Sequence, residues 1–240
     1  MGTFRFKRFE VVNERSAMKV NTDGVLLGAA MAIYSSDRRM LDIGTGTGTI
    51  ALMAAQRSDS PDVRIHAIDI DEASATEASA NFVNSPWGKN LEAFHMSLDE
   101  YERTLDGQEY DLIFSNPPYF EDSLNAPEER RNNARHTSTG LSYREILDFA
   151  SRRLSAEGRV CVVLPSETEH PLCRHARMDG LHLMRIIRVR TVPHKAPSRI
   201  IAEFSRTRVD SPAEEELVIQ EKGKYTERYL SLTSEFYLFA

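Results

Sequence analysis

The sequence contains little cysteine and no long apolar run, and each shortage excludes a class of protein. Only two cysteines occur, Cys161 and Cys173, which are too few for a disulfide framework. The longest apolar stretch, residues 24–34, is shorter than the roughly 20 residues that a membrane-spanning helix needs. Residues 1–10 alternate Phe with Arg and Lys and lack the apolar core of a secretory signal. We therefore expect a cytoplasmic protein with reduced thiols and no membrane contact.

The sequence also lacks the spacings of metal ligands and of a serine nucleophile. The seven histidines and two cysteines show no paired ligand spacing, and no serine lies in a G-x-S-x-G turn. We interpret His170, His175, His182 and His194 as surface or core residues. The sequence predicts no metal site, and 240 residues are enough to bury a core without one.

Charge is distributed unevenly along the chain. Residues 41–126 hold 16 Asp+Glu against 4 Lys+Arg, whereas residues 127–206 hold 9 against 15. No acidic residue occurs from position 180 to 202, a window that contains Arg185, Arg188, Arg190, Lys195 and Arg199. Two interpretations are open: a surface that meets a phosphate backbone, or a basic edge strand kept soluble by its charge.

The alternation of apolar runs predicts an α/β fold. Strands alternating with helices are typical of a mostly parallel sheet with helices on both faces. Two late strands joined by residues 192–197 add an antiparallel hairpin near the C-terminus. The expected strands are 39–43, 64–70, 92–96, 110–115, 159–164, 181–191 and 198–207, and the expected helices are 44–57, 73–84 and 143–154, the last ended by Gly158. No repeat or linker interrupts the pattern, so we predict a single domain over residues 1–240.

A glycine-rich corner joins the first of these strands to its helix. Asp42 precedes Gly44, Gly46 and Gly48 in the run Asp-Ile-Gly-Thr-Gly-Thr-Gly. Glycines permit a sharp turn and the close approach of a ligand, and free amides at a helix start favour an anionic group. Asp69 ends the next strand, 21 residues after Gly48, close to the distance at which an acid meets a ribose diol. The two signals indicate an adenosine-bearing cofactor.

The Asp42 carboxylate distinguishes between candidate cofactors. Directly before the glycines, it would repel a pyrophosphate but suits the ammonium group of an amino-acid cofactor. This favours S-adenosylmethionine over NAD, and the G-x-G-x-G spacing also differs from the G-x-G-x-x-G of dinucleotide sites. The segment resembles the first motif of Rossmann-like methyltransferases, and that resemblance implies that Asp69 holds the ribose.

Asn116, Pro117, Pro118 and Tyr119 follow the strand 110–115, at the edge where an open α/β sheet binds ligands. The tetrapeptide resembles the active-site motif of methyltransferases that modify planar amino groups of adenine, guanine or glutamine. Such a nitrogen is a weak nucleophile because its lone pair is delocalised, so positioning must help where basicity cannot. The resemblance implies that the Asn116 oxygen and the Pro117 carbonyl accept the two N–H bonds and that Tyr119 stacks on the base. A proline-terminated strand with a packed tyrosine is the alternative without a catalytic role.

Further segments resemble one bacterial group. They are residues 4–9, residues 17–29, Ser85-Pro86-Trp87, Asn116 to Phe120, Arg135-His136 and Lys224-Tyr225-Thr226. Together they are similar to the enzymes that methylate N6 of the adenine beside the anticodon of a valine tRNA. The resemblance implies a Rossmann-like methyltransferase domain, S-adenosylmethionine as cofactor, tRNA as substrate, and an N-terminal extension over residues 1–38 that covers the pocket.

The same resemblance assigns further cofactor contacts. It places Lys19, Thr22 and Asp23 near the pocket, although Thr22 or Asp23 is equally suited to cap the helix that follows. Ser97 stands where relatives often have an acid for the adenine ring, and Leu98 is the neighbouring candidate, with Asp99 as a substitute.

We expect two basic segments to meet an RNA backbone. They contain Arg130, Arg131 and Arg135 in the polar stretch 120–142, and Arg185, Arg188, Arg190, Lys195 and Arg199 in the acid-free window. The N-terminal Phe4, Phe6 and Phe9 suit either an unstacked base or an edge strand that docks its rings inward. For these phenylalanines we favour inward docking.

The sequence therefore predicts an S-adenosylmethionine-dependent N6-adenine methyltransferase that acts on tRNA, with no obligate protein partner. A guanine-N2 rRNA enzyme would use the same tetrapeptide. So would a protein-glutamine N5 methyltransferase, although such enzymes usually carry an N-terminal helical domain and only about forty residues precede the glycine strand. A non-catalytic nucleotide sensor would keep the glycine corner without needing Asn116.

Overall fold

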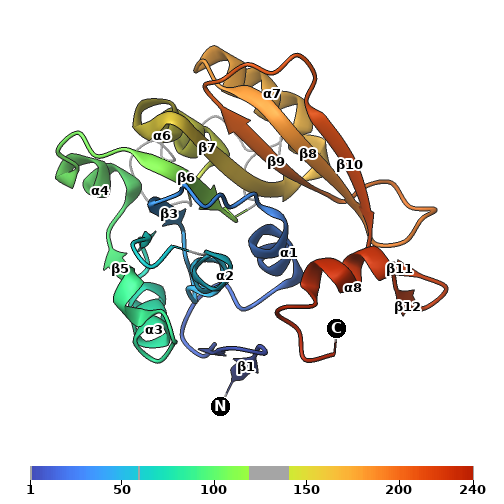
Figure 1. Cartoon of the computed structure of the whole chain (residues 1–240), viewed down its shortest axis with the longest axis horizontal. Helices are drawn as coiled ribbons and strands as arrows, with labels where there is room; N and C mark the ends of the chain where they lie inside the picture. Colours follow the sequence, from blue (N-terminus) through green and yellow to red (C-terminus); the bar gives the residue numbers. More distant parts are fainter. Residues whose placement is uncertain (1, 59, 119–140, 240) are drawn as a thin grey trace, which may run out of the picture.

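The computed structural model describes residues 2–58, 60–118 and 141–239. Its centre is an eight-stranded sheet with the strand order β10-β8-β9-β7-β6-β3-β4-β5 (Figure 1). The strands are β3 (Arg39–Ile43), β4 (Arg64–Asp69), β5 (Leu91–His95), β6 (Tyr110–Ser115), β7 (Leu154–Pro165), β8 (His182–Arg190), β9 (Arg199–Ser205) and β10 (Ala213–Val218). Two small hairpins lie outside this sheet, β1 (Thr3–Arg5) with β2 (Glu10–Val12), and β11 (Gln220–Glu221) with β12 (Lys224–Tyr225).

The pairing directions confirm the predicted sheet. Strands β3 to β7 pair in parallel, β9 is antiparallel to both β7 and β8, and β10 is parallel to β8. Because parallel strands end at the same edge, the residues that follow β3, β4 and β6 meet there. Strand β10 lies outside the sequence prediction, because three consecutive glutamates, residues 214–216, hide its apolar pattern.

Helices cover both faces of the sheet, as expected. One layer contains α1 (Thr22–Ala30), α2 (Thr49–Arg57), α3 (Glu72–Val83) and α8 (Glu227–Thr233), and the other contains α4 (Leu98–Thr104), α6 (Tyr143–Arg153) and α7 (Glu169–Met178). The described residues also include two short 3-10 helices, Gly88–Asn90 and Ser166–Thr168.

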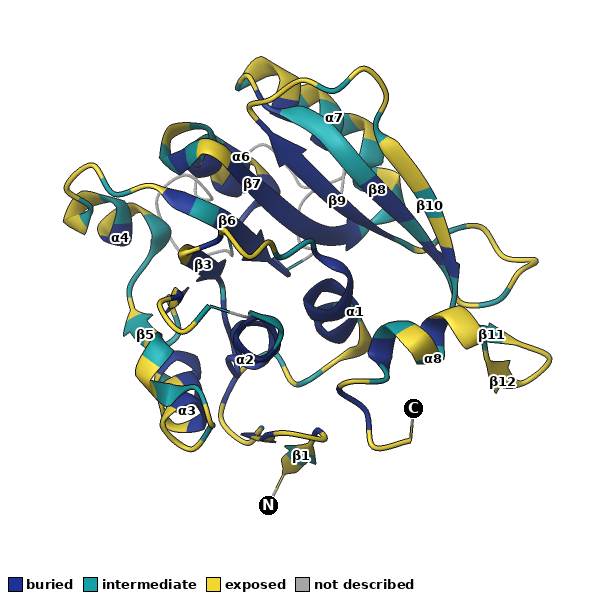
Figure 2. Cartoon of the chain, viewed as in Figure 1, coloured by how far each residue is buried: buried dark blue, intermediate teal, exposed yellow. Residues whose placement is uncertain are grey.

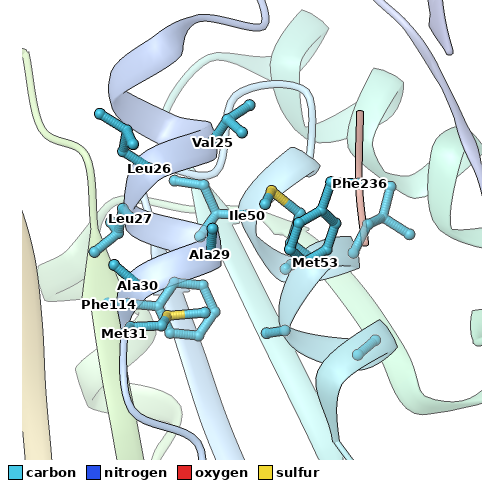
Figure 3. Packing of buried hydrophobic residues seen from close by; sticks show 14 of the residues in the cluster. Val25, Leu26, Leu27, Ala29, Ala30, Met31, Ile50, Met53, Phe114 and Phe236 are labelled. Carbon is cyan, nitrogen blue, oxygen red and sulfur yellow. The ribbon is translucent and has the colours of Figure 1, made fainter. Parts of the chain in front are cut away.

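Successive side chains along each strand pack alternately into the two helical layers. Met40 packs in the layer of α1 and α2, whereas its neighbour Leu41 packs in the layer of α6. Figure 2 shows the central strands buried along most of their length, and Figure 3 shows Met53 and Phe236 among the packed side chains of the first layer. Each such side chain contributes about 1.5–3 kcal/mol when it is fully buried.

Helix α1 begins at a different cap from the expected ones. The Oδ1 atom of Asn21 accepts a hydrogen bond from the Gly24 amide at 2.8 Å, so neither Thr22 nor Asp23 caps the helix. Gly28 brings α1 close to α2, since a Cβ at this position would lie 2.7 Å from the Met53 sulfur. Within the described ranges, no helix has the length and apolar character needed to cross a membrane.

The segment after α6 also differs from the prediction. Gly158 does not end a helix; it lies inside β7, which starts directly after α6 at Leu154. A Cβ on Gly158 would lie 2.6 Å from the Tyr110 carbonyl oxygen, at a register irregularity between β6 and β7. Glycine is needed there because two backbones approach closely.

The N-terminal phenylalanines dock inward, as we favoured. Phe6 and Phe9 are buried and stack with their ring centroids 4.5 Å apart, and Tyr237 stacks on Phe6 at 6.1 Å. The Lys7 amide donates a hydrogen bond to the Phe236 carbonyl at 2.8 Å. The N-terminal and C-terminal segments therefore lie side by side.

Candidate active site

The glycine corner forms a tight loop between β3 and α2. Gly44, Gly46 and Gly48 have φ angles of +72°, +56° and +79°, in the left-handed region that side chains disfavour. Gly48 is restricted twice, because a Cβ there would lie 2.5 Å from a ring carbon of Phe82. The loop presents backbone to the carboxyl edge of the sheet, as a close-fitting ligand requires.

Asp42, at the end of β3, is fully buried. Its Oδ2 atom accepts a hydrogen bond from the Thr45 hydroxyl at 2.7 Å, and its Oδ1 atom has no hydrogen-bond partner within the described residues. Burial raises the pKa of the Asp42 carboxyl to about 7; the Thr45 bond opposes this shift and the Asp69 charge adds to it. A buried acceptor without a partner suits a ligand that brings a donor, such as an ammonium group.

Asp69 lies at the end of β4 and binds the glycine loop directly. Its Oδ2 atom accepts from the Gly46 amide at 2.8 Å, and its Oδ1 atom accepts from the Asp71 amide at 2.9 Å. Burial raises the pKa of this carboxyl, and these two backbone bonds partly offset the shift. Each carboxylate oxygen has a second lone pair, so the site retains capacity for hydroxyl donors.

An N-terminal segment, residues 13–21, lies against the glycine loop. The Ser16 hydroxyl and the Met18 carbonyl oxygen lie 3.4 and 3.5 Å from the point where a Gly46 Cβ would stand. The buried Glu77 of α3 accepts hydrogen bonds from the backbone amides of residues 14, 15 and 16 at 2.8–2.9 Å. The Lys19 ammonium group donates back to the carbonyls of residues 13 and 14, at 3.1 and 2.7 Å.

Asn116 and the prolines follow β6 at the same edge. The Ser115 hydroxyl donates to the Ile43 carbonyl at 2.6 Å, which ties this strand end to the start of the glycine loop. Asn116 is buried, and its Nδ2 atom lies 3.5 Å from both Asn21 Oδ1 and Met18 Sδ. Pro117 is buried and Pro118 is half-buried. Tyr119 lies outside the described residues.

The structure thus brings Asn116, the glycine loop and Asp69 to one edge of the sheet. Asn116 adjoins the segment that lies on Gly46, and Gly46 binds Asp69. Sequence reasoning missed Asn21, Met18 and Glu77 as neighbours of this site. The signal for Glu77 was a carboxylate on the inward face of α3, in register with the buried Ser74 and Asn81.

Three predicted cofactor residues have a visible structural role or an outward position. Ser97 forms a capping box with Glu100, in which its hydroxyl lies 2.7 Å from the Glu100 carboxylate and its amide donates to that group. Leu98 packs on the second hydrophobic layer. Thr22 is exposed in the first turn of α1.

The arginines of the acid-free window form ion pairs with distant acids. Arg185 pairs with Glu215 at 2.6 Å, Arg188 with Glu169 and Glu214 at 2.5 and 2.7 Å, Arg190 with Glu216 at 3.0 Å, and Arg199 with Asp23 at 2.8 Å. The acids come largely from β10, which the linear charge count could not place beside β8. Lys195 is exposed in the loop between β8 and β9. Arg130, Arg131 and Arg135 lie outside the described residues.

Among residues 2–58, 60–118 and 141–239, the structure gathers one group of potential metal ligands that sequence spacing does not reveal. His175 lies 2.8 Å from Asp148 and 3.3 Å from Asp179, joining α7 to α6. The Nε2 atom of His175 hydrogen-bonds to Asp148, which accounts for that contact without a metal ion.

Comparison with known proteins identifies the family. Residues 16–177 match the model of the methyltransferase small domain. The chain is 42% identical over 236 residues to the tRNA1(Val) (adenine(37)-N6)-methyltransferase of Parabacteroides distasonis, covering 98% of this chain and 97% of the relative. It is 40% identical to the enzyme of the same name from Flavobacterium johnsoniae, covering 98% of this chain and 99% of the relative. The chain belongs to the tRNA1(Val) (adenine(37)-N6)-methyltransferase family.

Membership of this family confirms the expected class of enzyme, a methyltransferase that uses S-adenosylmethionine. A solved structure supports the fold independently of sequence. The crystal structure of a predicted O-methyltransferase from Agrobacterium tumefaciens superposes with a TM-score of 0.64 at 15% identity, covering 89% of this chain and 96% of that one. At this identity the likeness concerns the fold alone, and it confirms the Rossmann-like architecture.

Proposed function

We propose that this protein transfers the methyl group of S-adenosylmethionine to N6 of adenine 37 in tRNA1(Val). The supporting observation is about 40% identity over 98% of the chain to relatives that bear this name. The geometry agrees with it, because Asn116, Pro117 and Pro118 stand beside a glycine loop with a buried, unsatisfied carboxylate. We also propose that the protein acts in the cytoplasm as one domain, with residues 1–38 as its cover, without an obligate protein partner.

The residues at the glycine loop fit the proposed cofactor. The Oδ1 atom of Asp42 would accept the ammonium group, Asp69 would accept the ribose hydroxyls, and the amides around Gly44, Gly46 and Gly48 would lie against the cofactor backbone. S-adenosylmethionine supplies an electrophilic methyl group on a positively charged sulfur.

The remaining proposed cofactor contacts are less direct. Since the Ser97 hydroxyl and amide both serve the cap of α4, Ser97 would act by positioning Leu98, which we assign to the adenine ring. Lys19 would act through the position of its segment, because its ammonium group binds carbonyls of that segment. Thr22 would stand at the rim, on an exposed turn.

The catalytic residues would act by positioning. The Asn116 carboxamide oxygen and the Pro117 carbonyl would accept the two N6–H bonds, so that the nitrogen lone pair points at the methyl carbon. Pro118 restricts the backbone that carries this carbonyl, and Tyr119 would stack on the extruded base. The extra proton on the methylated nitrogen would leave to water, so no general base from the protein is required.

Basic side chains would bind the phosphates of the tRNA backbone. We retain Lys195, with Arg130, Arg131 and Arg135, as candidates to bind the tRNA phosphates. Arg185, Arg188, Arg190 and Arg199 would contribute only if phosphate competes with their carboxylate partners.

The test is transfer of labelled methyl groups to total tRNA that lacks the modification, with rRNA and release factors as parallel acceptors. We expect N6-methyladenosine in tRNA. Label in N2-methylguanosine or in glutamine would instead assign one of the two alternative methyltransferases. Cofactor binding without transfer would favour the nucleotide sensor.

Substitution Asn116→Ala tests the site itself. We expect kcat to fall by about a hundredfold or more, because positioning and hydrogen bonding to the amino group are lost together, while S-adenosylmethionine still binds. The exposed Asn84→Ala variant is the matched control and should retain full activity. Normal turnover in Asn116→Ala would refute the proposed role.

A further inference from the structure

A groove of about 420 Å³ lies on the outer face of α7, and it belongs to no site described so far. It is lined by His170, Arg174, Arg177 and Met178. The helical period explains this set, because Leu172 and Ala176 point into the core and the four lining residues occupy the opposite face. The groove therefore presents two guanidinium groups and an imidazole in one row.

The arginines of this row differ from those of β8. No salt bridge joins Arg174 or Arg177 to a carboxylate within the described part of the chain, whereas each β8 arginine has one. The acid at the start of α7, Glu169, is bound by Arg188, and Asp179 at its end lies against His175. Neither of these acids forms a salt bridge with Arg174 or Arg177, which leaves the groove cationic.

The position of α7 relates the groove to the active-site edge. Helix α7 follows β7 after a 3-10 turn, and β7 pairs with β6, the strand that ends at Asn116. The helix starts at the carboxyl edge of the sheet and runs back along one face for ten residues, about 15 Å. A polyanion whose base entered the site at Asn116 would pass this helix if it extended beyond β7.

We propose that the α7 groove binds the sugar-phosphate backbone of the tRNA whose adenine is methylated at Asn116. The inference rests on the proposed function, since it takes tRNA as the acceptor. Arginine forks bind phosphate oxygens in bidentate fashion, and residues at i, i+4 and i+7 of a helix form a continuous row. Met178, which is largely exposed, offers an apolar contact to a ribose.

The experiment compares two double charge reversals in the full-length protein. Arg174→Glu with Arg177→Glu changes the groove. Arg64→Glu with Lys89→Glu makes the same change in net charge at exposed positions near β4 and β5. These strands lie at the end of the strand order opposite to β8 and β10. For both variants and the wild type we would measure KM and kcat for unmodified tRNA, the Kd of tRNA at several salt concentrations, and the Kd of S-adenosylmethionine.

We expect the groove variant to raise KM for tRNA by about tenfold or more, with kcat and the cofactor Kd nearly unchanged. The slope of log affinity against log salt should fall by about 2, one for each lost phosphate contact. The control variant should stay within about twofold of the wild type.

Equal tRNA affinity in the groove variant and the control would overturn the proposal, and selective capture of an acidic protein by the groove would do the same. If the groove variant binds the cofactor more weakly or melts at a lower temperature, Arg174→Gln with Arg177→Gln removes the positive charges without adding negative ones and gives the same comparison. A wild-type protein that binds tRNA without methylating it would refute the proposed function. The tRNA affinities of the groove variant and the control could still be compared.

Discussion

At the scale of single residues, Asp42 combines complete burial, an unsatisfied oxygen and a pKa raised to about 7. An ionised carboxylate is costly there until a positive donor arrives. The residue therefore links cofactor affinity to pH, because a protonated Asp42 must lose its proton before it can hold an ammonium group.

We predict that the affinity for S-adenosylmethionine falls as the pH drops through about 7, by up to about tenfold per unit, because Asp42 becomes protonated. Above pH 8 the affinity should fall again, since a free α-amino group loses its proton with a pKa of about 8. Isothermal titration of the wild type, Asp42→Asn and the exposed control Asp62→Asn would check this. Asp42→Asn should bind about tenfold more weakly at pH 7.5 and lose the acidic limb; an acidic limb that persists would assign it to another group.

The same substitution has an opposite effect on the free protein. A carboxyl whose pKa is raised on folding, here from 3.8 to about 7, destabilises the folded state increasingly above the lower value and fully above the higher one. The melting temperature of Asp42→Asn without cofactor should therefore exceed that of the wild type at pH 8. Loss of affinity together with gain of stability excludes misfolding as the cause.

At the scale of elements, the N-terminal segment depends on helix α3. Glu77 accepts three backbone hydrogen bonds from residues 14–16, and Asn81 binds the amide and the carbonyl of Val12 at 2.8 and 3.0 Å. These contacts hold the segment that places Met18 and Asn21 beside Asn116.

We predict that Glu77→Ala raises KM for S-adenosylmethionine by about tenfold, because three backbone amides, one of them buried, lose their acceptor. Trypsin should then cut faster after Arg15 and Lys19, which lie in the released segment, residues 13–21. Glu77→Gln keeps an oxygen in place and should recover most of the affinity, and Glu72→Ala, on the exposed face of the same helix, is the control. An unchanged KM in Glu77→Ala would separate this segment from cofactor binding.

Some parts of the site could be predicted from the sequence and others could not. The glycine corner, Asp69 and Asn116 are specified by local runs of residues next to strands, so their patterns are visible in the chain itself. Other contacts join residues that are far apart in sequence. Glu77 accepts hydrogen bonds from residues 14–16, and β8 arginines pair with β10 glutamates. Linear patterns do not encode such contacts, and the charge count therefore did not reveal the acids that pair with Arg185, Arg188 and Arg190.

At the scale of the whole molecule, stacked aromatic rings connect the two ends of the described chain. Tyr237 lies between Phe6, at 6.1 Å, and Phe239, at 4.7 Å, and Phe239 stacks on Tyr225 at 5.4 Å. The fold class could be predicted from the periodicity of strands and helices. The contact between the two termini could not, because a family resemblance in each terminal segment does not show that the segments touch.

We predict that Tyr237→Ala lowers the free energy of unfolding by about 2–4 kcal/mol, because a nearly buried ring is removed from a packed stack. Its exposed neighbour gives the control, and Leu238→Ala should change stability by less than about 0.5 kcal/mol. Denaturant unfolding of Phe6→Ala, Tyr237→Ala and the double variant should show non-additive losses. Additive losses would mean that the two rings stabilise the protein independently.

The position of β10 at the end of the sheet has a consequence for self-association. An edge strand offers unpaired backbone groups to any second strand, and proteins often protect such edges with charge. If two copies met edge to edge in antiparallel register about Glu215, Glu214 of each would face Glu216 of the other, and like charges would oppose one another across the seam. The glutamates of β10 that pair with the β8 arginines would thus also disfavour edge-to-edge association of two copies.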